Sequence, residues 1–211
     1  MDPDYERIFK TPVRFRIIEK RTKVLEEFAA SINANRILSI ACEPRPWADR
    51  KRCFVNVEKK IERDGGRMLT GWIFNEYDSR SIEGEAHAIW EDRFGKKRID
   101  ITPHDFQPKR VLFLPDPRVA LKRGHTAHPR VILSDDPRLV AIEAFDDAVQ
   151  KLRESIFHGF GTEMVIMRED YEKARDDSGL PDDVARHLFQ KYCEADERAV
   201  QMYGIPKRST S

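Results

Sequence analysis

Three residues in the middle of the chain carry the side chains that a nucleophilic enzyme uses. Cys53 offers a thiol, His87 an imidazole and Asp100 a carboxylate. In such a set a thiolate attacks a carbonyl carbon, the histidine transfers the proton and the carboxylate orients the histidine. The three residues lie far apart along the chain, so the surrounding elements must bring them together.

A β-hairpin is expected to bring the histidine and the aspartate together. Strand-like segments at 82–91 and 98–102 flank Gly95, which suits the positive backbone angle of a hairpin turn. If the loop is Arg93-Phe94, His87 and Asp100 lie directly opposite each other, with Cβ atoms roughly 5 Å apart. A bulge in the turn would shift this register by one residue and still allow a diagonal contact.

The thiol is expected at the start of a short helix. Apolar residues recur at helical spacing after Cys53, and Gly65-Gly66 ends the pattern. Unpaired amides at a helix N-terminus favour a thiolate, and the basic segment 50–52 adds to this. The amide of Cys53 and the side chain of Asn56 or Trp47 are candidate donors to an oxyanion.

The rest of the chain predicts an α+β protein. Helical spacing at 12–34 predicts a long first helix, segments 67–77 and 110–114 predict further strands, and 37–42 fits either a strand or a helix end. Two helices follow, from Asp136-Pro137 to Ile156 and from Pro181 to Gly204. We therefore expect N-terminal helices, a central antiparallel sheet and a helical C-terminal third. The expected domains are an α+β core at 1–117 and a helical extension at 118–211, packed on that core.

Five short motifs lie in the middle of the chain: C-x-x-N-V from Cys53, G-W at Gly71, E-x-H-A-x-W from Glu85, D-I-T-P from Asp100 and F-L-P-D from Phe113. Their order resembles the transglutaminase-like branch of the papain-like superfamily, and in particular a group of largely uncharacterised bacterial proteins. The resemblance covers about residues 50 to 117. It departs from the better-known pattern in two ways. An extra residue precedes Trp90, and Arg52 precedes the cysteine.

The resemblance implies a thiol peptidase, amidase, deamidase or acyl transferase that acts on an amide or a thioester. It implies Cys53 as nucleophile, His87 as base and then acid, and Asp100 as the orienting carboxylate. Trp90 is expected beside the pocket. Glu85 shares a strand face with His87 and is expected to support the site. No cofactor and no metal are required by this chemistry, and a protein or peptide is the expected substrate.

Composition narrows the class of partner. The 38 basic residues nearly balance the 37 acidic ones, so no nucleic acid is expected as the main partner. No apolar run approaches the ~18 residues that span a bilayer, and the N-terminal residues lack a secretory pattern, so a cytoplasmic protein without a membrane segment is expected. Three cysteines with no repeated spacing are interpreted as thiols. The oligomeric state is left open.

Other interpretations compete with the thiol site. Cys53 and His87, with nearby acids such as Glu83 and Glu85, could form a metal site, and His125 and His128 could form a second one. Each of these residues could instead be a packed or solvated structural residue. A third hypothesis is a non-catalytic interaction module whose helical C-terminal third binds a partner. For Cys42 and Cys193, core packing is the better explanation.

Overall fold

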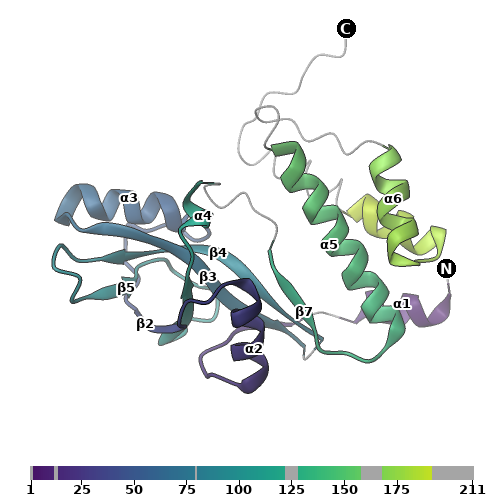
Figure 1. The fold of residues 1–211 in the computed structure, drawn as a ribbon, viewed down its shortest axis with the longest axis horizontal. Coiled ribbons are helices and arrows are strands. Elements are labelled where there is room, and N and C mark those ends of the chain that lie inside the picture. The colour runs from purple at the N-terminus through teal and green to yellow at the C-terminus, as the bar shows by residue number, and fades with distance from the viewer. Residues whose placement is uncertain (1, 12–13, 79, 122–127, 158–167, 192–211) are drawn as a thin grey trace, which may run out of the picture. The chain divides into compact units, whose positions relative to one another are not determined.

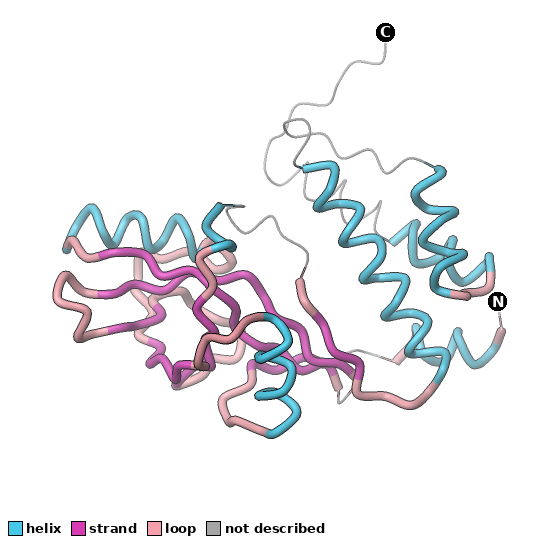
Figure 2. The backbone as a smooth tube through the Cα atoms, viewed as in Figure 1, coloured by secondary structure: helices cyan, strands magenta, loops and turns pink. Residues whose placement is uncertain are grey.

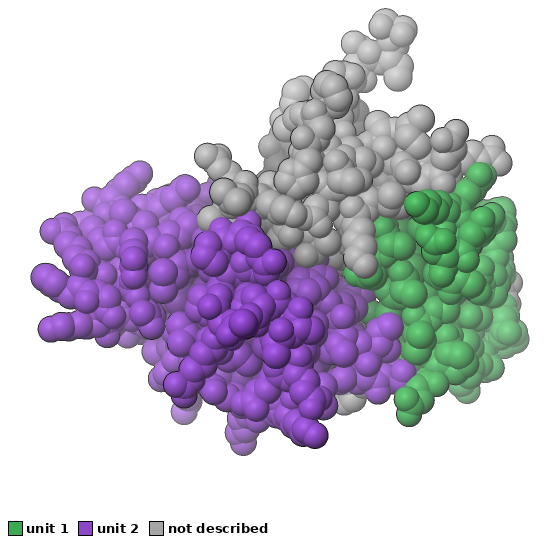
Figure 3. Space-filling model, viewed as in Figure 1, with its two compact units in different colours: residues 1–12, 135–211 green, residues 13–134 purple. Residues whose placement is uncertain are grey.

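The computed structural model describes residues 2–11, 14–78, 80–121, 128–157 and 168–191, and it divides the chain into two compact units. One unit is 13–134, and the other combines 1–12 with 135–211 (Figure 3). This division differs from the expected boundary at residue 117. Residues 130–132 form the last strand of the sheet, and the first helix packs with the C-terminal helices.

Seven strands form one sheet among the described residues of the unit 13–134 (Figures 1 and 2). The order is β1-β3-β6-β2-β5-β4-β7, and β3 also pairs with β4. The strands β3, β6, β2, β5 and β4 therefore close on themselves, and we call them the strand ring. The strands are β1 (Phe15–Ile17), β2 (Leu38–Cys42), β3 (Arg67–Tyr77), β4 (Ser81–Glu91), β5 (Arg98–Asp100), β6 (Arg110–Pro115) and β7 (Arg130–Ile132).

The sheet departs from the expected antiparallel arrangement at one pair. β2 and β5 run parallel, with Ala41 opposite Ile99 and Cys42 opposite Asp100. The other pairs in the ring are antiparallel. The ring has five members, and directions cannot alternate all the way around an odd number of strands. At least one parallel pair is therefore unavoidable.

Side chains alternate along the strands between the interior of the ring and its outer face, which the helices cover. One apolar cluster contains Ile40, Ile73, Ile89, Val111 and Phe113, which come from β2, β3, β4 and β6. Neighbouring residues along the same strands point the other way. They join two clusters that include helix residues, one with α2 (Lys23–Ile32) and one with α3 (Cys53–Asp64). The helix that begins with Cys53 thus packs on the outer face of β4.

The N-terminal segment differs from the single long helix expected at 12–34. The described part contains strand β1 and then α2, whose N-cap Thr22 accepts a hydrogen bond from the Leu25 amide at 3.2 Å. β1 pairs with the distal end of β3, where Phe15 faces Tyr77. A pairing over this sequence distance outweighs local helix propensity. The apolar segment 37–42 contains strand β2.

The second unit is helical. Its helices are α1 (Pro3–Lys10), α5 (Pro137–Phe157) and α6 (Arg168–Ser178), and residues 182–191 are also helical. α5 begins where the sequence predicts, with Asp136 accepting from the Arg138 amide at 3.0 Å. α6 was not expected. The predicted end of the last helix, Gly204, lies outside the described residues.

The mixed α+β class and the helical C-terminal part are confirmed. The short α4 (Arg118–Leu121) lies in the unit 13–134. None of the helices in the described ranges combines the length and the apolar character that a membrane crossing requires.

Candidate active site

Cys53 is the first residue of α3. The first helical hydrogen bond runs from the Asn56 amide to the Arg52 carbonyl at 2.9 Å, so the amides of residues 53–55 have no partner within the helix. The N-cap, Arg52, makes no side-chain cap. Cys53 is 8% exposed. The thiol therefore lies beside free amides at the positive end of a helix dipole.

Asn56 fixes the loop that precedes this helix. Its Oδ1 accepts from the Asp49 amide at 3.0 Å, and its Nδ2 donates to the Asp49 carbonyl at 2.7 Å. The same Nδ2 also donates to Thr102 Oγ1 at 3.2 Å. Both protons of the amide are used, and the side chain is fully buried. Asn56 is thus a positioning residue that connects the Cys53 loop to the segment after Asp100, and it does not line the cleft as an oxyanion donor would.

The hairpin brings His87 and Asp100 together by a diagonal contact. β4 and β5 pair Trp90 with Ile99 and Glu91 with Arg98, and the Asp92 amide donates to the Lys97 carbonyl at 2.9 Å. The loop therefore has four residues, 93–96, and the expected two-residue loop is wrong. The shift of two positions keeps the side chains on the same face because strand faces repeat every two residues. His87 Nε2 lies 3.0 Å from Asp100 Oδ2.

A second histidine, His104, binds the same carboxylate oxygen. Its Nε2 lies 2.6 Å from Asp100 Oδ2, while Asp100 Oδ1 accepts from the Thr102 amide at 3.0 Å. A carboxylate accepts but does not donate, so both Nε2 atoms carry the proton. His87 therefore has Nδ1 left to act as a base or to bind the thiol. The sequence analysis missed His104, although its place four residues after Asp100, beyond the turn at Thr102-Pro103, was a usable signal.

Charge and burial set the protonation of this cluster. Burial opposes a charged His87, but the Asp100 carboxylate and the Cys53 sulfur, both close to the ring, raise the pKa of His87 well above its usual value. Burial likewise opposes a charged Asp100, yet His87 and His104 hold the pKa of that carboxyl far below its usual range. The arrangement favours an imidazolium held between a carboxylate and a sulfur.

A cleft of about 300 Å³ gives access to the cluster. Cys53 and His87 lie in its wall, as does the predicted supporting residue Glu85. His87 is only 2% exposed, so the cleft is its route to solvent. The wall also contains residues that the sequence analysis did not single out for the site, among them Phe15, Asn75, Thr102, His104 and Phe106.

The two predicted tryptophans lie outside this wall. Trp90 donates its Nε1 proton to the Gly65 carbonyl at 2.8 Å, and the ammonium of Lys60 lies 4.9 Å from the ring centroid. Trp47 is covered by the guanidinium of Arg63 at 4.9 Å. Both pack in the cluster between α3 and the sheet. They pack against α3 away from the cleft, and neither is placed to donate to a bound carbonyl group.

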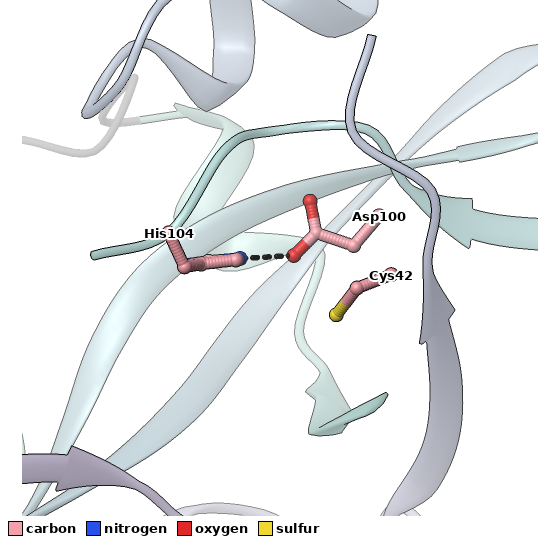
Figure 4. A group of neighbouring side chains, drawn as sticks. All are labelled: Cys42, Asp100 and His104. Carbon is pink, nitrogen blue, oxygen red and sulfur yellow. Dashed lines mark hydrogen bonds and ion pairs between the residues drawn. The ribbon is translucent and has the colours of Figure 1, made fainter. Parts of the chain in front are cut away.

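The residues with metal-ligand spacing differ from those expected. Among the described residues, ligand atoms within 4.8 Å of one another occur in the set Cys42, Asp100 and His104 (Figure 4). Burial, with Asp100 and Glu19 nearby, raises the pKa of the Cys42 thiol to about 12. This thiol is protonated at neutral pH and is a poor nucleophile.

The sequence analysis also considered His125 and His128 as metal ligands and Cys193 as a core residue. His128 Nδ1 lies 2.7 Å from Glu83 Oε1, and Arg130 also binds Glu83. This acid is therefore engaged in holding β7 beside β4. His125 and Cys193 lie outside the described residues.

No protein-family model, curated protein or solved structure matches the chain. The interpretation of the site therefore depends on its geometry and on the motif order described above.

Proposed function

We propose that the protein is a cysteine-dependent hydrolase or acyl transferase that acts on an amide or a thioester. The observation that carries the proposal is the 3.0 Å contact between His87 Nε2 and Asp100 Oδ2, with His87 and Cys53 in the wall of one cleft. The resemblance of the motif order to transglutaminase-like proteins supports the same chemistry. A peptide or protein is the proposed substrate.

The proposed reaction begins with the Cys53 sulfur attacking the carbonyl carbon of the substrate. The carbonyl π electrons move to oxygen, and the free amides at the start of α3 stabilise the negative charge. The C–N or C–S bond then breaks, and His87 Nδ1 gives its proton to the leaving group. An acyl group remains on Cys53 as a thioester.

Water or an amine then attacks the thioester while His87 Nδ1 takes up the proton of the attacking group. The Cys53 thiolate leaves, and the imidazolium and thiolate are restored. Asp100 holds Nε2 throughout and keeps the same ring nitrogen facing the sulfur. The identity of the attacking group separates a hydrolase from a transferase.

Alkylation with iodoacetamide at pH 7 tests this proposal. The labelled protein is digested, and the rate at each cysteine peptide is followed by mass spectrometry. Cys53 is expected to react at least about tenfold faster than Cys42 and Cys193, because a thiolate is the reacting species. The variant His87→Gln is expected to remove this advantage. Equal rates at the three cysteines in the wild type would exclude an activated nucleophile.

A metal site is the competing proposal. The ligand atoms of Cys42, Asp100 and His104 lie close enough to bind one ion, so these three residues are better candidate ligands than the set that includes Cys53. Cysteine, aspartate and histidine together suit Zn²⁺. Elemental analysis of protein purified without chelators distinguishes the two. Stoichiometric zinc that disappears in Cys42→Ala would support the metal site, and its absence from the wild type would argue against it.

A further inference from the structure

The cleft contains a pair of polar residues that the proposed reaction does not use. Asn75 on β3 and Glu85 on β4 both line it, together with Cys53 and His87. In the β3–β4 register, Asn75 faces Glu83 and Ile73 faces Glu85, so Asn75 and Glu85 are diagonal neighbours. Asn75 Nδ2 donates to Glu85 Oε2 at 2.8 Å. We call these two residues the Asn75–Glu85 pair.

This hydrogen bond fixes the orientation of the Asn75 amide. A carboxylate only accepts, so the NH₂ group of Asn75 must face Glu85 and the Oδ1 atom must face elsewhere. Asn75 is 2% exposed, and its Oδ1 is buried without a hydrogen-bond partner. A buried acceptor in this condition is unfavourable unless a donor is supplied. A ligand in the cleft could supply that donor.

The partners of the acidic residues near the cleft point to the kind of donor. Asp100 is neutralised by two histidines, and Asp105 by Arg50 at 2.6 Å. Within the described part of the chain, the hydrogen bond from Asn75 is the one contact recorded for the Glu85 carboxylate, and no cationic side chain pairs with it. The wall thus presents a carboxylate beside an unsatisfied amide oxygen.

Glu85 is also close to the reacting groups. It precedes His87 by two residues on the same strand face, which corresponds to a separation of about 7 Å along β4. Phe15 and Phe106, also in the wall, stack edge to face with ring centroids 5.2 Å apart, and Phe106 is 59% exposed. An aliphatic stem that ends in a cation could lie on these rings.

We propose that the Asn75–Glu85 pair binds an ammonium or guanidinium group of the substrate, and that the protein acts on peptides with a lysine or arginine side chain beside the reacting carbonyl. The statement about the reaction rests on the proposed function, whereas the statement about cation binding does not. The cation donates to Glu85 and to Asn75 Oδ1, and the aromatic rings contact its stem.

Binding is measured without the chemistry, in the variant Cys53→Ala. N-acetyl-lysine methylamide and N-acetyl-norleucine methylamide, which differ in the cationic group, are titrated separately and followed by NMR. The lysine compound is expected to bind at least about tenfold more tightly, because hydrogen bonds to charged groups are strong. Equal affinities would overturn the proposal, whether or not Cys53 is reactive.

Two variants in the same background test the residues. Glu85→Gln is expected to abolish the preference for lysine, while the matched control Glu62→Gln, on the exposed side of α3, preserves it. Glu85→Asp keeps the charge but shortens the reach. A direct contact predicts that the preference falls about as far as in Glu85→Gln. A preference retained in Glu85→Asp would show a general field effect and would overturn the binding site. Tryptophan fluorescence confirms that each variant is folded.

Discussion

Two fully buried carboxylates, Asp100 and Glu91, belong to neighbouring strands of the ring but bind different cations. Asp100 accepts from the ring nitrogens of His87 and His104. Glu91 accepts from Arg67 Nε and, at 2.6 Å, from Arg98 Nε. Arginine stays protonated at any ordinary pH, whereas histidine exchanges its proton near neutrality.

The partners of the two carboxylates also lie in different surroundings. The histidines that bind Asp100 line the cleft with Cys53. The arginines that bind Glu91 reach outward, with 69% of the Arg67 side chain and 40% of the Arg98 side chain exposed. Burial of an acid therefore does not identify an active site by itself. The titratable partners and the adjoining thiol make Asp100 the candidate, while Glu91 joins strand ends.

The largest expected effect comes from Asp100→Asn. The amide can donate its own proton to His87 Nε2, which moves the remaining ring proton to Nδ1 and removes the base that faces Cys53. Alkylation of Cys53 by iodoacetamide at pH 7 should fall on the order of a hundredfold. A change of less than about threefold would contradict the assigned role, provided that circular dichroism shows an intact fold.

The matched change Glu91→Gln should affect stability and leave reactivity nearly unchanged. Glutamine keeps one acceptor oxygen but has no charge, so one of the two hydrogen bonds is lost and the other is weakened. Because both arginines are partly solvated, the expected loss is about 2 kcal/mol in the free energy of unfolding. All three tryptophans of the chain lie in the unit 13–134, so fluorescence during urea titration reports this unit. A fall in Cys53 alkylation beyond about twofold would remove the contrast with Asp100.

His104→Leu should have a smaller effect on reactivity. Asp100 would keep its bond to His87 but lose the second histidine that restrains its Oδ2 atom. We expect Cys53 alkylation to fall about fivefold, the effect of one modest hydrogen bond. A loss as large as that in Asp100→Asn would instead make His104 an equal partner in the chemistry.

The smallest expected effect is the pH dependence of stability. The pKa values of Asp100 and Glu91 are lowered in the fold, so both acids stabilise it above about pH 4, and this stability is lost as the pH falls through the lowered values. The pKa of His87 is raised, so its contribution is complete below about pH 6.5 and is lost as the pH rises through the folded value.

The interactions of Asp100 with its histidines therefore stabilise the fold less at both ends of the pH range. The interactions of Glu91 with its arginines stabilise it less only in acid. Urea titrations between pH 4 and pH 10 should show an alkaline decline of about 1 kcal/mol in the wild type. This decline should persist in Glu91→Gln and disappear in His87→Gln. A decline that survives in His87→Gln would have another origin.

The parts of the fold with strong local patterns could be predicted from the sequence. β3, β4 and the start of α3 carry β-branched, aromatic or amphipathic patterns with glycine at their ends, and the structure has them where expected. β1 has three residues, too few to show alternation, and it is stabilised by pairing with residues about sixty positions away. Local propensity could not reveal it.

The candidate site was predictable in its members but not in its geometry. Residue types and motif order identified Cys53, His87 and Asp100, whereas the two-residue register error arose because loop length depends on backbone angles that Gly95 permits but does not fix. Asn75 and His104 were missed because their roles come from diagonal and turn contacts. Asn56 was identified with the wrong role, since its amide protons are consumed by the Asp49 carbonyl and Thr102.

The parallel pairing of β2 with β5 also concerns how the site is assembled. It joins residues 41–42 to 99–100, so one side of the segment carrying Asp100 is held by a strand almost sixty positions earlier, whereas its other side pairs with β4 within the hairpin. Closing such a long loop costs more chain entropy than closing a hairpin. The carboxylate of the proposed site is thus fixed by one local pairing and one distant pairing.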